Sequence, residues 1–254
     1  MLRATVLLSF LLALSGFVFF SIDEVDAGTL SDRLISAAEL GQVDEVAGLL
    51  DQGVPVEARD EDGWTALMKA TYEGHENVVQ ELIGRGADVD SQENAGWTPL
   101  MMAAQFGYRE IASILLDSGA RIDIQNSAGT TAVMLAALNG HQGMLADLQP
   151  TAAAVNIRDH KGKTALIFCA GGGFDEGVRQ LISFGAAVDA KDNNGNTALI
   201  LAAQLGHEAV VKTLLEHCAD VRANDNQGKT ASKWAVEKQH SKIFQLLVTA
   251  PPCN

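Results

Sequence analysis

The sequence of 254 residues predicts an all-α solenoid of about seven helix-turn-helix units linked by β-turn fingers. Two periodic patterns support this fold class. A glycine recurs every 33 residues, and a threonine stands two positions after each of these glycines. The glycines are Gly63, Gly96, Gly129, Gly162, Gly195 and Gly228, and the threonines are Thr65, Thr98, Thr131, Thr164, Thr197 and Thr230. A fixed period of this length is typical of stacked repeats, in which each unit buries its apolar face against its neighbours.

Each unit begins with a turn and a first helix, as the period from Asp60 to Val89 shows. Its first residues combine acids, which can bond to their own turn, with Gly63, which is free to adopt a positive φ. Thr65 is suited to cap the helix that follows, because its hydroxyl can accept from an unpaired backbone N–H. The next apolar positions recur at i, i+1, i+3 and i+4, which places them on one helix face. Gly74 is expected to end this helix.

A second helix is predicted from Glu76 to Ile83 in the same period. Its valines and its leucine fall on one face, which is expected to point toward the first helix. Gly86 suits the left-handed position just beyond the end of a helix. Each unit therefore consists of a turn and two antiparallel helices.

The repeated pattern Asp-x-x-Gly-x-Thr-Ala-Leu-Met-x-Ala, followed by Gly-His and Leu-Ile-x-x-Gly-Ala-Asp-Val, resembles the ankyrin repeat. The resemblance extends over nearly all of the chain after its first 27 residues. One departure is that the family's histidine after Thr-Pro-Leu is replaced by an apolar residue. The replacements are Met68, Met101, Met134, Ile167 and Ile200. They remove a polar link to the turn and add apolar packing, so the expected fold is unchanged.

The periodicity divides the chain into four segments. We expect residues 1–27 to be a signal peptide, 28–58 an N-terminal capping repeat, 59–224 five ankyrin repeats, and 225–254 a C-terminal capping repeat with a tail. The first repeat lacks the Gly-x-Thr turn, and the last has polar residues at positions that are apolar elsewhere. Both changes suit the ends of a stack, where one face has no neighbour. In the fourth repeat, Pro150 is expected to shorten the second helix.

The first 27 residues have the features of an export signal. Arg3 precedes an apolar run from Ala4 to Phe20, and Val25-Asp26-Ala27 provides small residues where a signal peptidase cuts. We expect cleavage after Ala27 and a periplasmic protein. The alternative is an uncleaved anchor, since the apolar run approaches the length of a membrane-spanning helix. In both cases the repeats lie outside the cytoplasm, because the positive end stays inside.

Charge and motifs argue against several function classes. The net charge of −14 argues against nucleic-acid binding, which requires a basic face, whereas it permits a basic partner. His75, His141 and His207 are two repeats apart, so they are not expected to converge on one metal ion. The glycines at 171–173 lie between two helices rather than after a strand, which argues against a phosphate loop. We expect no catalytic residues, no metal and no cofactor; an enzyme with an unrecognised site is the rival class.

The resemblance also points to a binding surface. In ankyrin-repeat proteins, the residue after the finger glycine and the end of the first helix line the concave face that meets a partner. The residues assigned to partner binding on this basis are Trp64, Tyr72, Trp97, Gln105, Phe106, Leu138 and Asn139. Adjacent exposed aromatic side chains are the usual anchors of interfaces. The alternative is that the two tryptophans only cover neighbouring fingers. The later fingers carry Lys163, Asn196 and Lys229 instead, so affinity is expected to concentrate in the N-terminal half.

The resemblance implies a non-enzymatic module that binds another folded protein, and we expect the free chain to be a monomer. Exported bacterial ankyrin-repeat proteins resemble accessory factors. We therefore expect the chain to bind and inhibit, or protect the cell against, an exported enzyme such as a cell-wall peptidase. The alternatives are a membrane-anchored periplasmic scaffold and an accessory protein of a stress enzyme. Contact with the membrane is expected only if the N-terminal segment is not cleaved.

The three cysteines fall at different repeat positions. Cys169 stands at an alanine position of a first helix, so we expect it to be a buried free thiol. Cys218 replaces the glycine that ends a second helix, and Cys253 lies two positions later in the next unit. An oxidising compartment would allow a disulfide between Cys218 and Cys253 that fastens the tail, although an odd number of cysteines leaves other pairings open.

Overall fold

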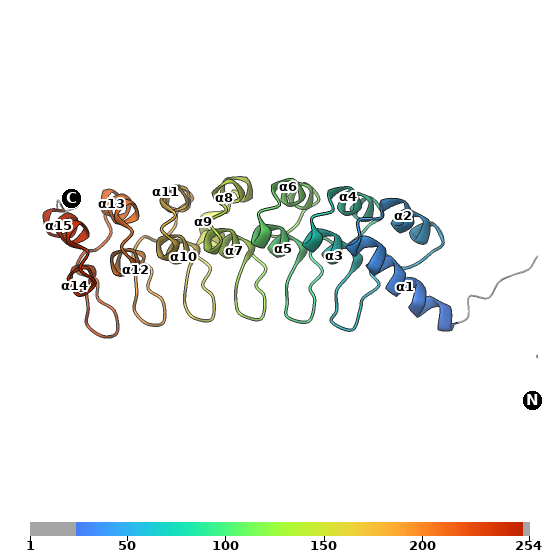
Figure 1. Cartoon of the computed structure of the whole chain (residues 1–254), viewed down its shortest axis with the longest axis horizontal. Coiled ribbons are helices and arrows are strands. Elements are labelled where there is room, and N and C mark those ends of the chain that lie inside the picture. Colours follow the sequence, from blue (N-terminus) through green and yellow to red (C-terminus); the bar gives the residue numbers. More distant parts are fainter. Residues whose placement is uncertain (1–23, 251–254) are drawn as a thin grey trace, which may run out of the picture.

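The structure, a computed structural model, describes residues 24–250, with side chains from Thr29 onward, and confirms the predicted all-α solenoid. Figure 1 shows two rows of helices that run the length of the molecule, with a row of loops, the fingers, on one side. The inner row, next to the fingers, is made of α1 (Glu24–Glu39), α3 (Ala66–Glu73), α5 (Pro99–Phe106), α7 (Ala132–Leu138), α10 (Ala165–Gly172), α12 (Ala198–Leu205) and α14 (Ala231–Glu237). The outer row is made of α2 (Val43–Asp51), α4 (Glu76–Gly84), α6 (Arg109–Asp117), α8 (Gln142–Leu148), α11 (Asp175–Ser183), α13 (Glu208–Glu216) and α15 (Ser241–Thr249).

Helix α1 begins before the boundary expected for a signal peptide. It starts at Glu24, so the residues up to Ala27 lie in its first turn. Leu34 and Ala37 on this helix are buried, as expected for a capping repeat that shares the core. The rest of the proposed signal peptide lies outside the described residues, and its cleavage stays a prediction. Among the described helices, none combines the length and the apolar character needed to cross a membrane.

The threonine positions determine where the inner helices start. In α3, α5, α7, α10, α12 and α14, the threonine hydroxyl accepts a hydrogen bond of 3.2–3.5 Å from the backbone N–H three residues later. This bond satisfies one of the N–H groups that a helix start leaves without a partner. Gly74 ends α3 in the left-handed conformation, with φ of 81°. The predicted caps are therefore confirmed.

The fingers are held by bonds within each turn and between neighbouring turns. Oδ1 of Asp60 accepts from the backbone N–H groups of Asp62 and Trp64, and the equivalent residue of every later finger accepts the same two bonds, although Glu93 uses both of its oxygens for them. Between fingers, the backbone N–H of Asn94 donates to the carbonyl of Asp62, and this bond recurs once per period. A ladder of side chains runs parallel to it, in which Arg59, Gln92, Gln125, Arg158 and Lys191 each donate to the carbonyl 33 residues later. Neighbouring fingers are thus joined edge to edge.

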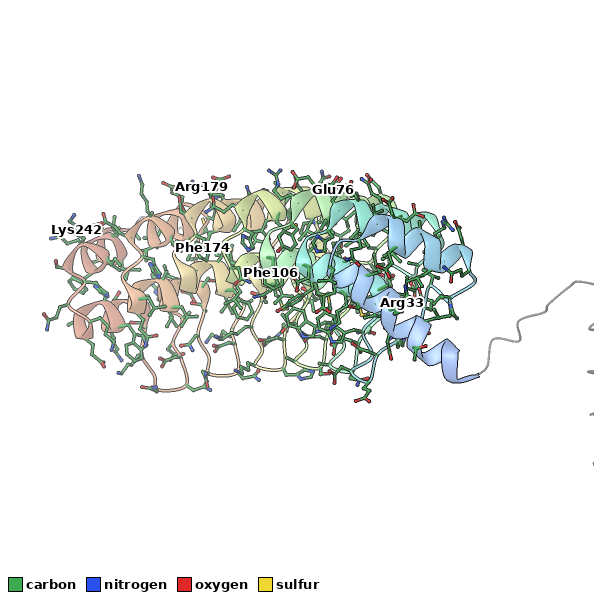
Figure 2. All side chains as sticks on the ribbon, turned by 45° about the vertical axis from the view of Figure 1, so that its right-hand side comes forward. Arg33, Glu76, Phe106, Phe174, Arg179 and Lys242 are labelled. Atoms are coloured by element: carbon green, nitrogen blue, oxygen red, sulfur yellow. The ribbon has the colours of Figure 1, made fainter. Side chains whose placement is uncertain are left out.

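A column of ring side chains lies where the outer helices begin and contacts the preceding repeat. Its members, one at the start of each outer helix from α4 on, are His75, Tyr108, His141, Phe174, His207 and His240. Nε2 of each histidine lies 3.0–3.3 Å from a backbone carbonyl oxygen of the preceding repeat. Phe174, labelled in Figure 2, replaces this polar bond with packing against Gly140 and Gly172. The histidines therefore join repeats.

The fourth repeat departs from the others, as Pro150 predicted. Helix α8 ends at Leu148 and is shorter than the other outer helices, and Gln149 is left-handed with φ of 40°. A short helix that the sequence did not predict, α9 (Ala152–Val155), follows. Its start is capped by Thr151, whose hydroxyl accepts from the N–H of Ala154 at 3.2 Å.

The described cysteines differ in state. Cys169 is a free thiol in the core, as predicted, and burial raises its pKa to about 12. Cys218 takes part in a disulfide. Cys253, the partner proposed from the sequence, lies outside the described residues, so that pairing stays a prediction.

Candidate protein-binding groove

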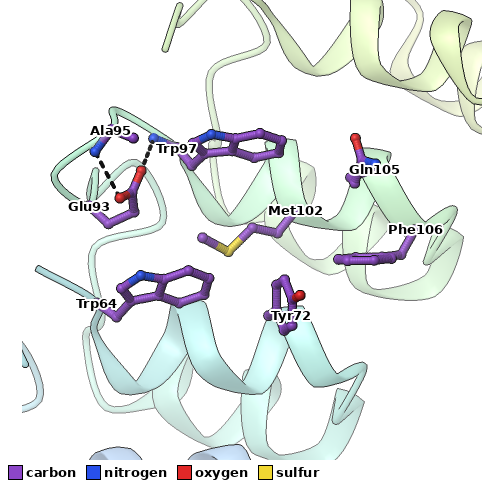
Figure 3. Close-up of a pocket in the computed structure, with 8 residues that line it drawn as sticks. All are labelled: Trp64, Tyr72, Glu93, Ala95, Trp97, Met102, Gln105 and Phe106. Carbon is purple, nitrogen blue, oxygen red and sulfur yellow. Dashed lines mark hydrogen bonds between the residues drawn. The ribbon is translucent and has the colours of Figure 1, made fainter. Parts of the chain in front are cut away.

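A groove opens on the finger side of the second and third repeats. Its cavity has a volume of about 340 Å³. The lining residues, which Figure 3 shows together, are Trp64, Tyr72, Glu93, Ala95, Trp97, Met102, Gln105 and Phe106. They come from two adjacent fingers and from the inner helices α3 and α5. We call this feature the aromatic groove.

Four aromatic rings form a continuous line along and beside the groove. The Trp64 and Tyr72 rings meet edge to face with centroids 5.4 Å apart, and the Tyr72 and Phe106 rings do so at 5.0 Å. Phe106 also stacks on Tyr108 at 5.7 Å. Tyr72 and Phe106 are 43% and 40% exposed, so much of this apolar surface faces solvent. Trp64 and Trp97 are half-buried, so the alternative in which they only cover neighbouring fingers stays open.

The backbone of each finger positions its tryptophan. The N–H of Trp64 donates to Oδ1 of Asp60 at 2.8 Å. The N–H of Trp97 donates to Oε1 of Glu93 at 2.8 Å, as Figure 3 shows. The other Glu93 oxygen accepts from the N–H of Ala95. The Glu93 carboxylate is therefore bonded to its own turn.

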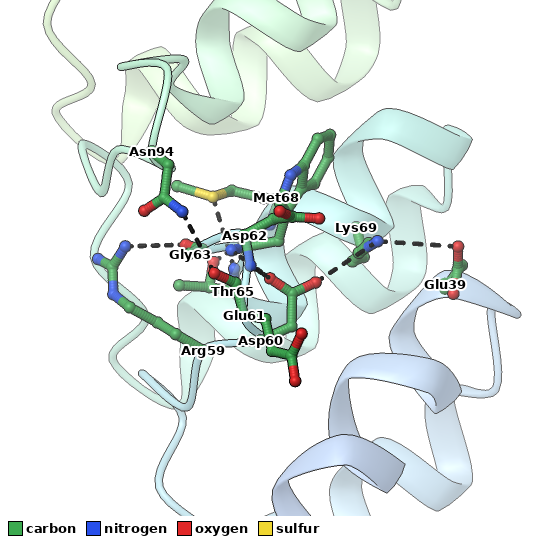
Figure 4. Close-up of polar contacts among 11 residues, drawn as sticks. Glu39, Arg59, Asp60, Glu61, Asp62, Gly63, Thr65, Met68, Lys69 and Asn94 are labelled. Carbon is green, nitrogen blue, oxygen red and sulfur yellow. Dashed lines mark hydrogen bonds and ion pairs between the residues drawn. The ribbon is translucent and has the colours of Figure 1, made fainter.

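The Trp64 ring carries a cation from its own repeat. Nζ of Lys69 lies 4.8 Å from the centre of the ring. The same ammonium is 3.7 Å from Asp60 and 4.0 Å from Glu39, which ties it to the finger and to α1 (Figure 4). The lysine thus joins the capping repeat to the second repeat.

The predicted site residues of the fourth repeat continue the line beyond the groove. Leu138 is 49% exposed at the end of α7. Asn139 donates through Nδ2 to Oε1 of Gln105 at 3.2 Å and to the carbonyl of Leu135 at 2.8 Å. Five of the seven predicted residues therefore line one cavity. The other two, Leu138 and Asn139, lie on the adjacent repeat, and Asn139 is bonded to Gln105 of the cavity wall.

Sequence reasoning missed three lining residues, Glu93, Ala95 and Met102. Met102 is the informative omission, since it is 2% exposed and lies between the two tryptophans in Figure 3. The sequence does contain a signal for Met102: it lies five residues after Trp97, as Lys69 lies five residues after Trp64.

The fingers of the later repeats were expected from the sequence to be polar. Two of their lysines, Lys163 and Lys229, lie over aromatic rings of the same chain. Nζ of Lys163 lies 5.3 Å from the centre of the Phe168 ring, and Nζ of Lys229 lies 3.9 Å from the centre of the Trp234 ring. In both pairs the ring belongs to the inner helix, five residues after the lysine. These lysines are therefore partly engaged rather than free for a partner.

The chemistry of the groove favours binding. Its walls are aromatic rings, and its one carboxylate, Glu93, already accepts two backbone hydrogen bonds. Over residues 24–250, no group of three or more histidine, cysteine, aspartate or glutamate side chains is arranged to hold a metal ion. Large rings in a shallow groove can bury an anchoring side chain of a partner.

Comparisons with known proteins identify the repeat fold. A family model described as ankyrin repeats (3 copies) matches residues 34–126, 118–192 and 171–254. Among solved structures, the chain is similar to the ankyrin repeat protein EF0377. That protein is 32% identical, with a TM-score of 0.69, and the match covers 76% of this chain and 100% of that chain. No curated protein matches the chain.

Proposed function

Because the chain belongs to the ankyrin-repeat family, whose fold is a typical scaffold for protein–protein interaction, we propose that it is a non-enzymatic module that binds a folded protein in the periplasm. The observation that supports this most directly is the aromatic groove. Four rings lie on two adjacent repeats, and Tyr72 and Phe106 are large and solvent-exposed. A soluble monomer has little reason to expose contiguous apolar surface unless a partner covers it.

The proposed role is to inhibit, or protect against, an exported enzyme, with a cell-wall peptidase as the example. The support is the leader-like sequence of the first 27 residues, which predicts export, together with a binding surface that has no catalytic set of its own. A rigid surface of this kind can cover the entrance of an enzyme without reacting with its substrate.

Two other roles rest on the same N-terminal segment and on the same surface. An uncleaved segment would make the chain a membrane-anchored scaffold. A cleaved chain that leaves the activity of its partner unchanged would be an accessory protein, for example of a stress enzyme.

The location is tested by fractionating cells and sequencing the N-terminus of the exported chain. A start at Gly28 and recovery with soluble periplasmic proteins are the expected results. An intact Met1 with retention in carbonate-washed membranes would support the anchored scaffold instead.

The binding role is tested by crosslinking in the native envelope, followed by affinity capture and mass spectrometry. Capture with the wild-type chain is compared with capture by Trp64→Ala/Trp97→Ala. The expected partner is an exported protein that the double variant no longer retains. Purified partner is then assayed for turnover with increasing amounts of the chain, and unchanged turnover would exclude the inhibitor role.

A further inference from the structure

We propose that the aromatic groove takes the guanidinium group of an arginine side chain presented by the partner. This inference deepens the proposed function, on which it rests for the choice of surface. It follows from three observations: a ring–cation pattern that recurs along the chain, its interruption at the groove, and the charge of the surrounding side chains.

The chain uses one local geometry three times to place an ammonium over a ring. The residue after the finger glycine and the inner-helix residue five positions later form the pair in each case. The pairs are Trp64 with Lys69 at 4.8 Å, Lys163 with Phe168 at 5.3 Å, and Lys229 with Trp234 at 3.9 Å. These distances lie within the range in which a cation is attracted to a ring face. The ring can therefore stand at the finger position with the lysine on the helix, or the lysine at the finger position with the ring on the helix.

The third repeat has the ring but lacks the cation. Trp97 occupies the finger position, and Met102 stands where the lysine of the second repeat stands. Within the described part of the chain, no lysine or arginine lies over Trp97, Tyr72 or Phe106. The third repeat supplies most of the groove lining, and its Trp97 ring can therefore accept a cation from another molecule.

The charges beside the groove favour a cation over a neutral apolar group. Glu61 and Asp62 are exposed on the finger of Trp64, and Glu73 is exposed directly after Tyr72. None of these three carboxylates forms an ion pair within residues 24–250. The two cations of this repeat beside the groove are already engaged. Lys69 is shared between Asp60 and Glu39, and the Arg59 guanidinium donates to the backbone carbonyls of Gly63 and Gln92.

A guanidinium suits the groove better than an ammonium does. It is planar, is more weakly hydrated and stacks on aromatic faces. The groove offers ring faces and an amide oxygen, Oε1 of Gln105, which accepts from Asn139 at 3.2 Å and keeps a second lone pair. Arginine is also enriched in the buried centre of protein interfaces.

The test is an NMR titration of the full chain labelled with ¹⁵N-tryptophan. The sequence has three tryptophans, so Trp64 and Trp97 report on the groove and Trp234 is an internal reference. The probes are the peptides acetyl-Gly-X-Gly-amide, in which X is arginine, citrulline, norleucine or lysine, at matched ionic strength. The arginine peptide is expected to shift the two groove signals and leave that of Trp234 in place. It is expected to bind about two- to thirtyfold more tightly than the citrulline peptide, which has nearly the same shape without the charge.

The proposal is overturned if the citrulline or norleucine peptide binds as tightly as the arginine peptide, or if no probe moves the Trp97 signal up to its solubility limit. Equal binding of the lysine peptide would overturn the assignment to a guanidinium.

A pair of variants at Met102 provides a second test. Met102→Lys gives the third repeat the lysine that the second repeat has at this position, five residues after the finger tryptophan. The new ammonium is therefore expected to lie over the Trp97 ring and remove the arginine response. Met102→Leu, which conserves volume and adds no charge, is expected to retain it. Far-UV circular dichroism and the Trp234 signal check that both variants are folded. An undiminished arginine response in a folded Met102→Lys chain would contradict the proposal.

Failure of this inference differs from failure of the proposed function. If the arginine peptide does not bind but Trp64→Ala/Trp97→Ala loses its captured partner, the groove binds a partner through another group. If the peptide binds but the partner is retained by that double variant, the chemistry of the groove holds and the proposed surface is wrong.

Discussion

The indole nitrogen of Trp234 donates a 2.8 Å hydrogen bond to Oδ2 of Asp225, nine residues earlier in the chain. The other oxygen of this carboxylate accepts from the backbone N–H groups of Gln227 and Lys229 at 2.9 Å each. Burial acts to raise the pKa of Asp225, but the bonds from Lys229, Trp234 and Gln227 outweigh it and hold this pKa below its usual value. The native last repeat therefore favours the ionised carboxylate.

This shift predicts how the stability of the chain depends on pH. Since the folded pKa of Asp225 lies below the unfolded one, about 3.9, its contribution is present above that value and is lost as the pH falls through the folded pKa. In Asp225→Asn this group no longer titrates, so the free energy of unfolding is expected to fall less steeply as the pH is lowered. The asparagine keeps the two backbone bonds, as Asn126 does in the finger of the fourth repeat, but its Nδ2 is a donor and cannot accept from Nε1 of Trp234. The variant is therefore expected to be less stable near pH 7 and less sensitive to acid. Urea unfolding at several pH values below 6 measures this, and an identical pH profile in both proteins would refute it.

Cys169 is expected to resist alkylation in the native chain. Its pKa of about 12, against an ordinary value of 9.0, lowers the thiolate fraction near pH 8 by on the order of a thousandfold. Peptide mapping after iodoacetamide treatment should find it modified only when denaturant is present. Modification of native Cys169 at the rate of a free thiol would show that the core opens or that the thiol is accessible.

The two glycines at the end of α10 are expected to respond oppositely to alanine. A Cβ at Gly171 meets nothing within 4 Å, so Gly171→Ala should raise the free energy of unfolding by about 0.5–1 kcal/mol through helix propensity. A Cβ at Gly172 would lie 2.3 Å from the Phe174 ring, which also abuts Gly140 and has little room to move. Gly172→Ala should therefore lower the free energy of unfolding by about 1–3 kcal/mol. Denaturant unfolding of the two variants side by side is the measurement, and stabilisation by both would mean that the ring is mobile.

The binding surface is tested by two matched double variants on opposite halves of the chain. Trp64→Ala/Trp97→Ala is expected to weaken the complex with the captured partner by about thirtyfold or more, because a central aromatic anchor contributes about 2 kcal/mol. Its far-UV helical signal should be unchanged. Lys163→Ala/Lys229→Ala should cost much less affinity, since both lysines already lie over rings of their own repeats. Isothermal titration calorimetry compares them, and a larger loss for the lysine pair would place the interface in the C-terminal half.

The features that sequence predicted well depend on contacts between near neighbours in the chain. Thr65 and Gly74 start and end α3 through bonds to residues three or four positions away, so the motif itself contains the cause. Pro150 ends α8 for an equally local reason. Trp64 and Trp97 line one cavity because the repeat period places them in register, whereas their role in partner binding stays a prediction.

The features that sequence did not predict depend on contacts across the stack. Helix α9 follows Pro150 at a position where the other units have none, and the threonine cap that permits it is not part of the periodic pattern. The polar bond of His75 to the carbonyl of Glu39 joins residues 36 positions apart, which a single repeat cannot reveal. Met102 was missed because its burial between two rings needs both fingers to be in place.

The ladder that begins at Arg59 also has a consequence for how such a chain changes in length. Each bond of the ladder joins a donor to an acceptor one full period later, as Arg59 does with Gln92 and Lys191 with Asn224. Excision or duplication of a whole unit from the middle would return every donor to an acceptor of the same kind, whereas an excision of any other size would not. The ladder therefore favours changes of length in steps of 33 residues, because these leave its bonds between neighbouring fingers unchanged.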